Sequence, residues 1–164
     1  MTEEYMQDLI AYPDASRVWI YQSNKPFGDD EVDRVNAYIE RFAREWTSHN
    51  LQLKATGGLM HRHFIVLVVD ETRAGASGCS IDKSVRFIQF LEQEFGQNLF
   101  DRLTFAYLQD KEVRLIRQAD LKEAYEKGEI TDQTLFFNNL VKTKKEYLDG
   151  WLVPLGESWH KRMI

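Results

Sequence analysis

The apolar run Phe64–Val69 is the feature that most constrains the fold of this 164-residue chain. Successive side chains of a strand point to opposite faces, so six apolar residues in a row make both faces apolar. Such a strand is typical of the centre of a sheet that is covered on both sides. The run ends in Asp70 and Glu71, and a loop of small residues and an amphipathic helix over about 80–95 follow. We therefore predict a central strand, a loop and a helix as the unit that organises the fold.

Hydrophobic periodicity and turn residues predict the other elements. Gly57-Gly58 is interpreted as a hairpin turn that leads into the central strand. Capping-box patterns begin at Asp120 and Thr143 and indicate two short helices. The predicted strands are 17–22, 51–56, 59–70, 103–108, 112–116 and 134–137, and the predicted helices are 29–46, 80–95, 120–127 and 143–149.

The order of the first six elements, strand-helix-strand-strand-helix-strand, matches the split βαβ or ferredoxin-like plan. We therefore predict an α+β protein whose antiparallel sheet carries helices on one face. A smaller C-terminal β/α extension should follow. The expected divisions are an N-terminal segment at 1–16, an α+β core at 17–109 and an extension at 110–164, packed together as one compact unit.

Composition limits the partners and the compartment. Apolar residues make up 43% of the chain, which is enough for a packed core, and the net charge of −5 argues against a general nucleic-acid binder. A single cysteine cannot form an intramolecular disulfide and fits a reducing compartment. The longest apolar run is far shorter than the ~20 residues of a membrane helix. We expect a cytoplasmic protein that does not enter the membrane.

The loop before the second long helix is the first candidate site. Glycines allow unusual backbone conformations, and the first turn of a helix has free N–H groups and a partial positive charge. Together these features can hold a phosphate or a carboxylate. We therefore predict a small anionic ligand at 75–83. The expected ligand-binding residues are Gly75, Ser77, Gly78, Ser80 and Lys83.

Cys79 lies at the same place and is the predicted catalytic or redox-sensitive residue. A thiol at a helix N-terminus is expected to have a lowered pKa, which favours the nucleophilic thiolate. The alternative is that the small residues only allow a tight turn, that Ser80 caps the helix and that Cys79 is a buried apolar side chain. The loop is not a P-loop, because Gly75 and Gly78 are too close together and no lysine follows the second glycine.

Two further groups of residues allow metal chemistry as an alternative, although no cofactor and no metal ligand is assigned. Asp70, Glu71 and Asp82 could hold Mg²⁺ or Mn²⁺ in a metal-dependent phosphohydrolase. His61 and His63 would share one face of a strand, which suits a metal ion. The ordinary interpretations are that Asp70 and Glu71 end a strand and that Asp82 interacts with the helix dipole. The two histidines would then simply lie on a half-exposed face.

The C-terminal segment Ser158-Trp-His160 has two interpretations. The tail can close over a site, or Trp159 can anchor it to the body of the protein. Exposed C-terminal tryptophans would also suit the alternative function, a non-enzymatic interaction or scaffold protein. A further alternative is that the partner is a second copy of the chain, in a homodimer.

Four segments, RVWIYQSN at 17–24, GASGCSIDKSVRFIQFLEQEFG at 75–96, FNNLV at 137–141 and VPLGESWH at 153–160, carry a resemblance to a known family. The chain resembles a group of small uncharacterised bacterial proteins often labelled "ABC transporter ATPase". The resemblance covers nearly the whole chain and implies a small cytoplasmic bacterial protein. The chain contains neither a Walker A loop nor an ABC signature.

Overall fold

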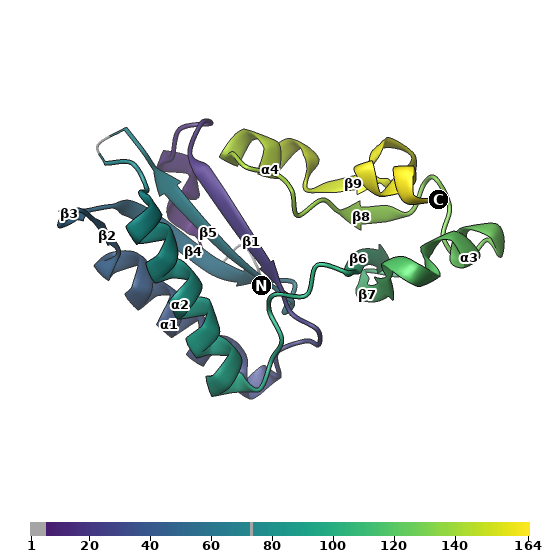
Figure 1. Ribbon diagram of the computed structural model, residues 1–164, viewed down its shortest axis with the longest axis horizontal. Coiled ribbons are helices and arrows are strands. Elements are labelled where there is room, and N and C mark those ends of the chain that lie inside the picture. Colours follow the sequence, from purple (N-terminus) through teal and green to yellow (C-terminus); the bar gives the residue numbers. More distant parts are fainter. Residues whose placement is uncertain (1–5, 73) are drawn as a thin grey trace.

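The structure, a computed structural model, describes residues 6–72 and 74–164. This part of the chain is an α+β protein with four α-helices and three antiparallel sheets. Helices α1 (Asp29–Glu45) and α2 (Gly78–Phe95) cover one face of the first sheet, and a second sheet lies against its other face (Figure 1). Helix α3 (Leu121–Glu126) packs on the far side of the second sheet. The α+β prediction is confirmed.

The first sheet contains β1 (Arg17–Gln22), β4 (Lys54–Met60) and β5 (Phe64–Asp70) in the order β1-β5-β4. Both pairs are antiparallel, and all seven residues of β5 are buried. One set of alternate side chains packs toward the helices and the other toward the second sheet. The side chains that pack toward the helices are Ile65, Leu67 and Val69. Those that pack toward the second sheet are Phe64, Val66 and Val68. The predicted central strand, covered on both sides, is confirmed.

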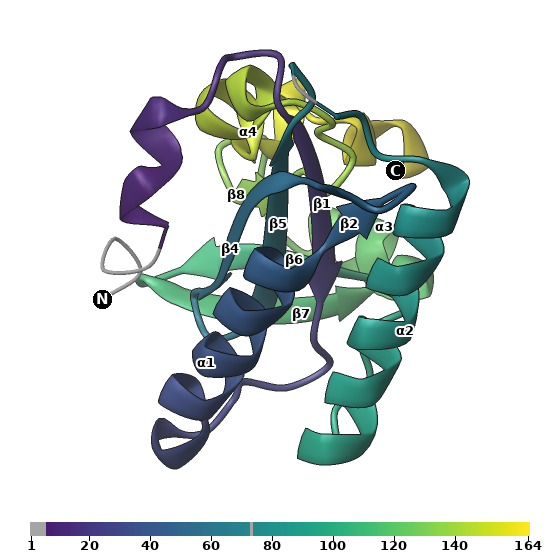
Figure 2. The same ribbon diagram turned by 90° about the vertical axis from the view of Figure 1, so that its left-hand side faces the viewer.

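The two long helices lie beside each other along one face of this sheet (Figure 2). Val35 and Ile39 of α1 and Ile88 and Leu91 of α2 have no exposed area and belong to the same core cluster. The spacing of three and four residues therefore predicted the buried stripes correctly. Helix α2 begins at Gly78, two residues earlier than the sequence suggested. No helix in the described part of the chain has the length and apolar character needed to span a membrane.

The C-terminal half forms the second sheet, in the order β7-β6-β8-β9, with every pair antiparallel. Its strands are β6 (Thr104–Gln109), β7 (Glu112–Arg117), β8 (Leu135–Phe137) and β9 (Leu152–Pro154). Helix α4 (Lys144–Gly150) connects β8 to β9. The third sheet is a small pair, β2 (Thr47–Ser48) and β3 (Leu51–Gln52).

The ferredoxin-like topology predicted from element order is not evident in the order of the strands. That plan would place β6 beside β1, whereas β6 lies in the second sheet, between β7 and β8. The free edge of β1 instead meets the segment before α4, where Val18 N donates to Lys142 O at 2.9 Å and Arg17 bridges Thr143. The physical reason lies in β5, because helices on one face of the sheet leave its other apolar face to be covered by the second sheet.

The segments before and after the central unit meet in one cluster. Tyr12 and Trp151 belong to the core cluster that contains Phe64, and the Nζ of the buried Lys144 donates to Tyr12 O at 2.7 Å. Residues 7–11 of the N-terminal segment form a 3-10 helix. The expected boundary between residues 109 and 110 falls at the turn of the β6–β7 hairpin.

The hairpin turn predicted at Gly57-Gly58 is wrong. Both glycines are buried inside β4, and the chain turns instead at His61 and Arg62, whose φ angles are 51° and 59°. The glycines serve close packing, because a β-carbon at residue 57 would lie 2.7 Å from Val66 O and 2.9 Å from Ile39 Cγ2. Gly57 therefore lets α1 approach the sheet.

We expect Gly57→Ala to lower the free energy of unfolding by about 1–3 kcal/mol, the usual cost of overpacking a well-packed core. The nearest atom is a backbone oxygen, which cannot rotate away. Chemical denaturation measures the change. Gly78→Ala is the matched control, since no described atom lies within 4 Å of a β-carbon there and the residue opens α2. Equal stability of the two variants would contradict the close approach at Gly57.

Candidate functional site

The loop predicted to bind an anion caps its own helix. Ser77, not Ser80, is the N-cap of α2, and its hydroxyl accepts from Ser80 N at 3.2 Å. In return Ser80 Oγ accepts from Ser77 N at 2.7 Å and donates to Ser77 O at 2.9 Å. The two serines form a reciprocal capping box, so their polar groups satisfy the end of the helix.

The other residues of this loop are close in space but their polar groups are largely occupied. Lys83 Nζ donates to Thr47 Oγ1 at 3.0 Å, and Ala76 N donates to the carboxylate of Glu71 at 2.8 Å. Cys79 is exposed, which excludes the buried alternative for this residue. Gly75 and Gly78 are exposed beside it. The anion site at 75–83 and the reactivity of Cys79 stay predictions.

The acidic residues at the C-terminal end of β5 take part in local contacts. Asp70 accepts from Thr72 N at 3.0 Å and lies 3.7 Å from Lys54 Nζ, and these contacts hold the pKa of this carboxyl below its usual value. Within residues 6–72 and 74–164, no group of three or more His, Cys, Asp or Glu side chains is arranged to hold a metal ion. The phosphohydrolase alternative stays a prediction.

The two histidines near β5 do not share a strand face. His61 lies in the turn, and His63 Nδ1 is 3.0 Å from His61 O. Burial lowers the pKa of His63. The centroid of the His61 ring lies 5.2 Å from the centroid of the Phe137 ring. His61 and His63 therefore belong to the turn between β4 and β5 and to the core next to it.

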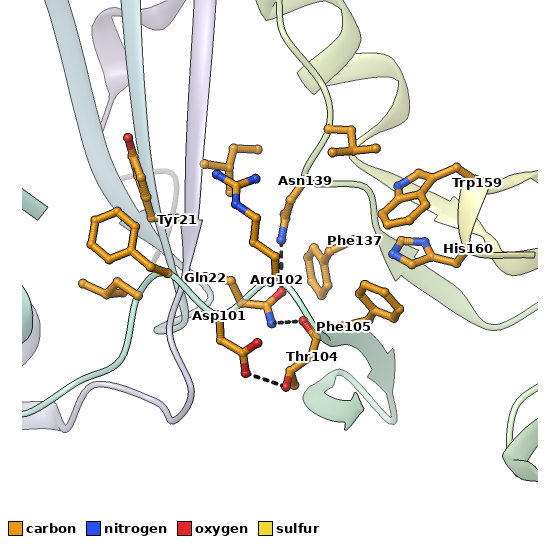
Figure 3. A pocket seen from close by; sticks show the side chains of 14 residues that line it. Tyr21, Gln22, Asp101, Arg102, Thr104, Phe105, Phe137, Asn139, Trp159 and His160 are labelled. Carbon is orange, nitrogen blue, oxygen red and sulfur yellow. Dashed lines mark hydrogen bonds between the residues drawn. The ribbon is translucent and has the colours of Figure 1, made fainter. Parts of the chain in front are cut away.

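A cavity of about 140 Å³ lies where the first sheet meets the second (Figure 3). Four separate segments contribute to it: the end of β1, the connection from α2 to β6, the segment after β8 and the C-terminal tail. We call it the seam cavity. Its lining residues are Ile20, Tyr21, Gln22, Leu99, Phe100, Asp101, Arg102, Thr104, Phe105, Phe137, Asn139, Leu140, Trp159 and His160.

Aromatic rings form one wall of the seam cavity. Trp159 stacks on His160 at 4.1 Å between ring centroids, and Phe105 stands edge-on to Trp159 at 5.4 Å, with 83° between the ring planes. Trp159 Nε1 also donates to Asn138 Oδ1 at 3.0 Å. The tryptophan therefore anchors the tail and lines a cavity at the same time, as both interpretations of this segment proposed.

A chain of amide hydrogen bonds crosses the seam. Gln22 Nε2 donates to Thr104 O at 3.0 Å, and Asn139 Nδ2 donates to Gln22 Oε1 at 3.0 Å (Figure 3). Trp151 Nε1 completes the chain by donating to Asn139 Oδ1 at 2.9 Å. Each amide nitrogen carries two hydrogens, and these bonds use one of each. One N–H of Gln22 and one of Asn139 thus have no partner among the described residues and remain for a ligand.

His160 is a buried, neutral residue of the seam cavity, and one tautomer of its ring can donate a hydrogen bond into the cavity. Its side chain is 1% exposed, and burial lowers its pKa to about 4, so the ring is uncharged near pH 7. Ser158 Oγ lies 2.6 Å from His160 Nδ1 and accepts from His160 N at 3.4 Å. In the tautomer in which the hydroxyl donates to Nδ1, the ring proton is on Nε2. Nε2 has no hydrogen-bond partner among the described residues, and the ring lines the cavity.

Arg102 and Asp101 bring opposite charges to the cavity. Asp101 accepts from Leu103 N at 2.7 Å and from Thr104 Oγ1 at 2.8 Å, and these bonds hold its pKa below the usual value. Arg102 forms no ion pair with a described residue. Burial raises the pKa of Tyr21, and the charge of Arg102 opposes that rise, as expected for a guanidinium near the phenol. Arg102 is therefore the cation that a ligand can use.

Sequence reasoning found only part of this site. Ser158-Trp-His160 was named as a tail able to close over a site, and Trp159 and His160 do line the seam cavity. Gln22, Arg102 and Asn139 were missed, because nothing in their local sequence distinguishes them from ordinary polar residues. Their common location depends on how the two sheets dock.

Comparison with known proteins gives no relative from which a role could be transferred. No family model, no curated protein and no solved structure matches the chain. The functional interpretation therefore depends on the geometry of the seam cavity and on the chemistry of its lining.

Proposed function

We propose that the protein binds a small anionic ligand, carrying a carboxylate or a phosphate, in the seam cavity. This is the ligand class that the sequence suggested, at a different place in the fold. The observation that carries the proposal is that several hydrogen-bond donors belong to the lining of a small, mostly apolar cavity. The donors are the Arg102 guanidinium, His160 Nε2 and the unused amide hydrogens of Gln22 and Asn139.

The chemistry of the lining favours an acceptor-rich ligand. Binding sites for small molecules are typically apolar hollows with a few polar groups that fix orientation. The one carboxylate of this lining, Asp101, is already bound by its own loop, whereas Arg102 has no ionic partner among the described residues. A guanidinium can bind a carboxylate or a phosphate through two parallel hydrogen bonds, which are stronger than neutral ones.

We expect Arg102→Gln to weaken the binding of a small carboxylate about tenfold or more, since a hydrogen bond to a charged group contributes roughly 1.5–3 kcal/mol. Titrations with benzoate, acetate and inorganic phosphate, followed by the ¹H–¹⁵N chemical shifts of the labelled protein, measure binding to the parent protein and to the variant. Arg86→Gln is the matched control, because Arg86 is an exposed residue of α2 outside the cavity lining. Absence of binding by all three anions, or equal losses in the two variants, would contradict the proposal.

A further inference from the structure

We infer that the ligand is a planar aromatic monocarboxylate of the benzoate class, with its ring against Phe105 and Trp159 and its carboxylate at Arg102. This inference rests on the proposed function and adds to it the shape and the charge of the ligand. It draws on three properties of the seam cavity: its volume, the orientation of its rings and its balance of charge.

The volume fits one six-membered ring. The seam cavity holds about 140 Å³, and an engineered protein cavity of about 150 Å³ takes up one benzene molecule. A single ring therefore occupies the hollow. Its charged substituent must then lie at the edge of the hollow, where the exposed Arg102 contributes to the lining (Figure 3).

The orientation of the rings favours an aromatic ligand over a saturated one. The ring planes of Phe105 and Trp159 are nearly perpendicular, at 83°. The ring planes of Phe105 and His160 form an angle of 71°. Walls of this kind present both ring faces and ring edges. An aromatic ring gains from edge-to-face and offset contacts because its face is negative and its edge positive. A cyclohexane ring has no such quadrupole and is thicker.

The charges favour a single negative charge on the ligand. Arg102 supplies one positive charge, Asp101 one negative charge, and the buried His160 stays neutral near pH 7. A monoanion at Arg102 pairs with the guanidinium and adds one unit of repulsion from Asp101. A phosphate monoester carries close to two negative charges at pH 7, and the second charge would leave water without a second cation in the lining to pair with it.

The test is a set of NMR titrations at pH 7.5, followed at the Trp159 indole N–H. Three probes are compared: benzoate, cyclohexanecarboxylate and phenyl phosphate. We expect benzoate to bind at least about fivefold more tightly than each of the other two. Cyclohexanecarboxylate matches benzoate in charge and carbon number, so the difference between them reports the aromatic contacts. Phenyl phosphate keeps the ring, so its affinity reports the preference for one charge.

The possible results separate this inference from the proposed function. Equal or tighter binding of cyclohexanecarboxylate would overturn the aromatic part, and tighter binding of phenyl phosphate would overturn the monocarboxylate part. In both cases the anion-binding function would stand. Failure of all three probes to bind would instead contradict the proposed function itself.

Phe105→Leu is the matched variant, because leucine keeps much of the apolar volume and removes the ring. We expect benzoate affinity to fall about threefold or more while cyclohexanecarboxylate affinity changes less than twofold. Equal losses for both probes would count against aromatic recognition. The dispersed amide spectrum of the variant verifies that it is folded.

Discussion

Replacing Phe64 by alanine should lower the free energy of unfolding by about 3–5 kcal/mol, the range for truncating a buried phenylalanine. Phe64 has no exposed area and begins β5 on the face that meets the second sheet. Its ring centroid lies 4.5 Å from that of Phe137 and 5.0 Å from that of Trp151. The substitution therefore removes a large part of the apolar contact between the two sheets. Equilibrium denaturation with urea measures the loss.

Phe90→Ala provides the control for this experiment. Phe90 is 42% exposed on α2 and contacts Tyr38 at 5.0 Å between ring centroids. Because little buried area is lost there, we expect a change below about 1 kcal/mol. Equal destabilisation of both variants would contradict the close packing of the two sheets. Unfolding of only the C-terminal half by Phe64→Ala would contradict it as well.

We also expect the stability of the protein to fall as the pH drops from about 6.5 to about 4. The unfolded chain binds a proton at His160 near the ordinary pKa of 6.5, whereas burial lowers the pKa in the folded protein to about 4. Between these values the unfolded state binds more protons, so acid favours unfolding. The full contribution, present above pH 6.5 and lost by pH 4, is on the order of 3 kcal/mol.

Urea denaturation at pH 7 and at pH 4.5 tests this expectation in the parent protein and in two variants. His160→Phe removes the titrating group and should reduce the difference in stability between the two pH values. Trp159→Phe keeps His160 and should retain most of it. The pKa of His63 is also lowered by burial. Its protonation therefore lowers the stability at acidic pH in all three proteins. A parent protein as stable at pH 4.5 as at pH 7 would contradict the burial of a neutral His160.

Elements governed by local sequence could be predicted well. The buried strand β5 follows from six apolar residues in a row, and α1 follows from apolar residues three and four positions apart. The turn between β6 and β7 was predicted at 109–111, and Asp110 and Lys111 adopt the positive φ angles of a tight hairpin. In each case the pattern and the structure reflect the same short-range physics.

Features that depend on contacts between distant segments could not be predicted. Gly57 resembles a turn residue, yet it is a glycine because α1 passes close to β4. The position of β6 depends on which face of β5 lacks a cover, and element order carries no such information. The seam cavity brings Gln22 to Asn139, 117 residues apart, through a bond that exists only once the sheets have docked.

Chemical-shift mapping tests the central claim most directly. Benzoate and inorganic phosphate would be titrated separately into ¹⁵N-labelled protein, and the saturable shifts placed on the fold. We expect them at the side-chain amides of Gln22 and Asn139, at the Trp159 indole and at the backbone of Arg102. Shifts confined to the 75–83 loop at the start of α2, with none at the seam cavity, would contradict the account and return the anion site to the place that the sequence suggested.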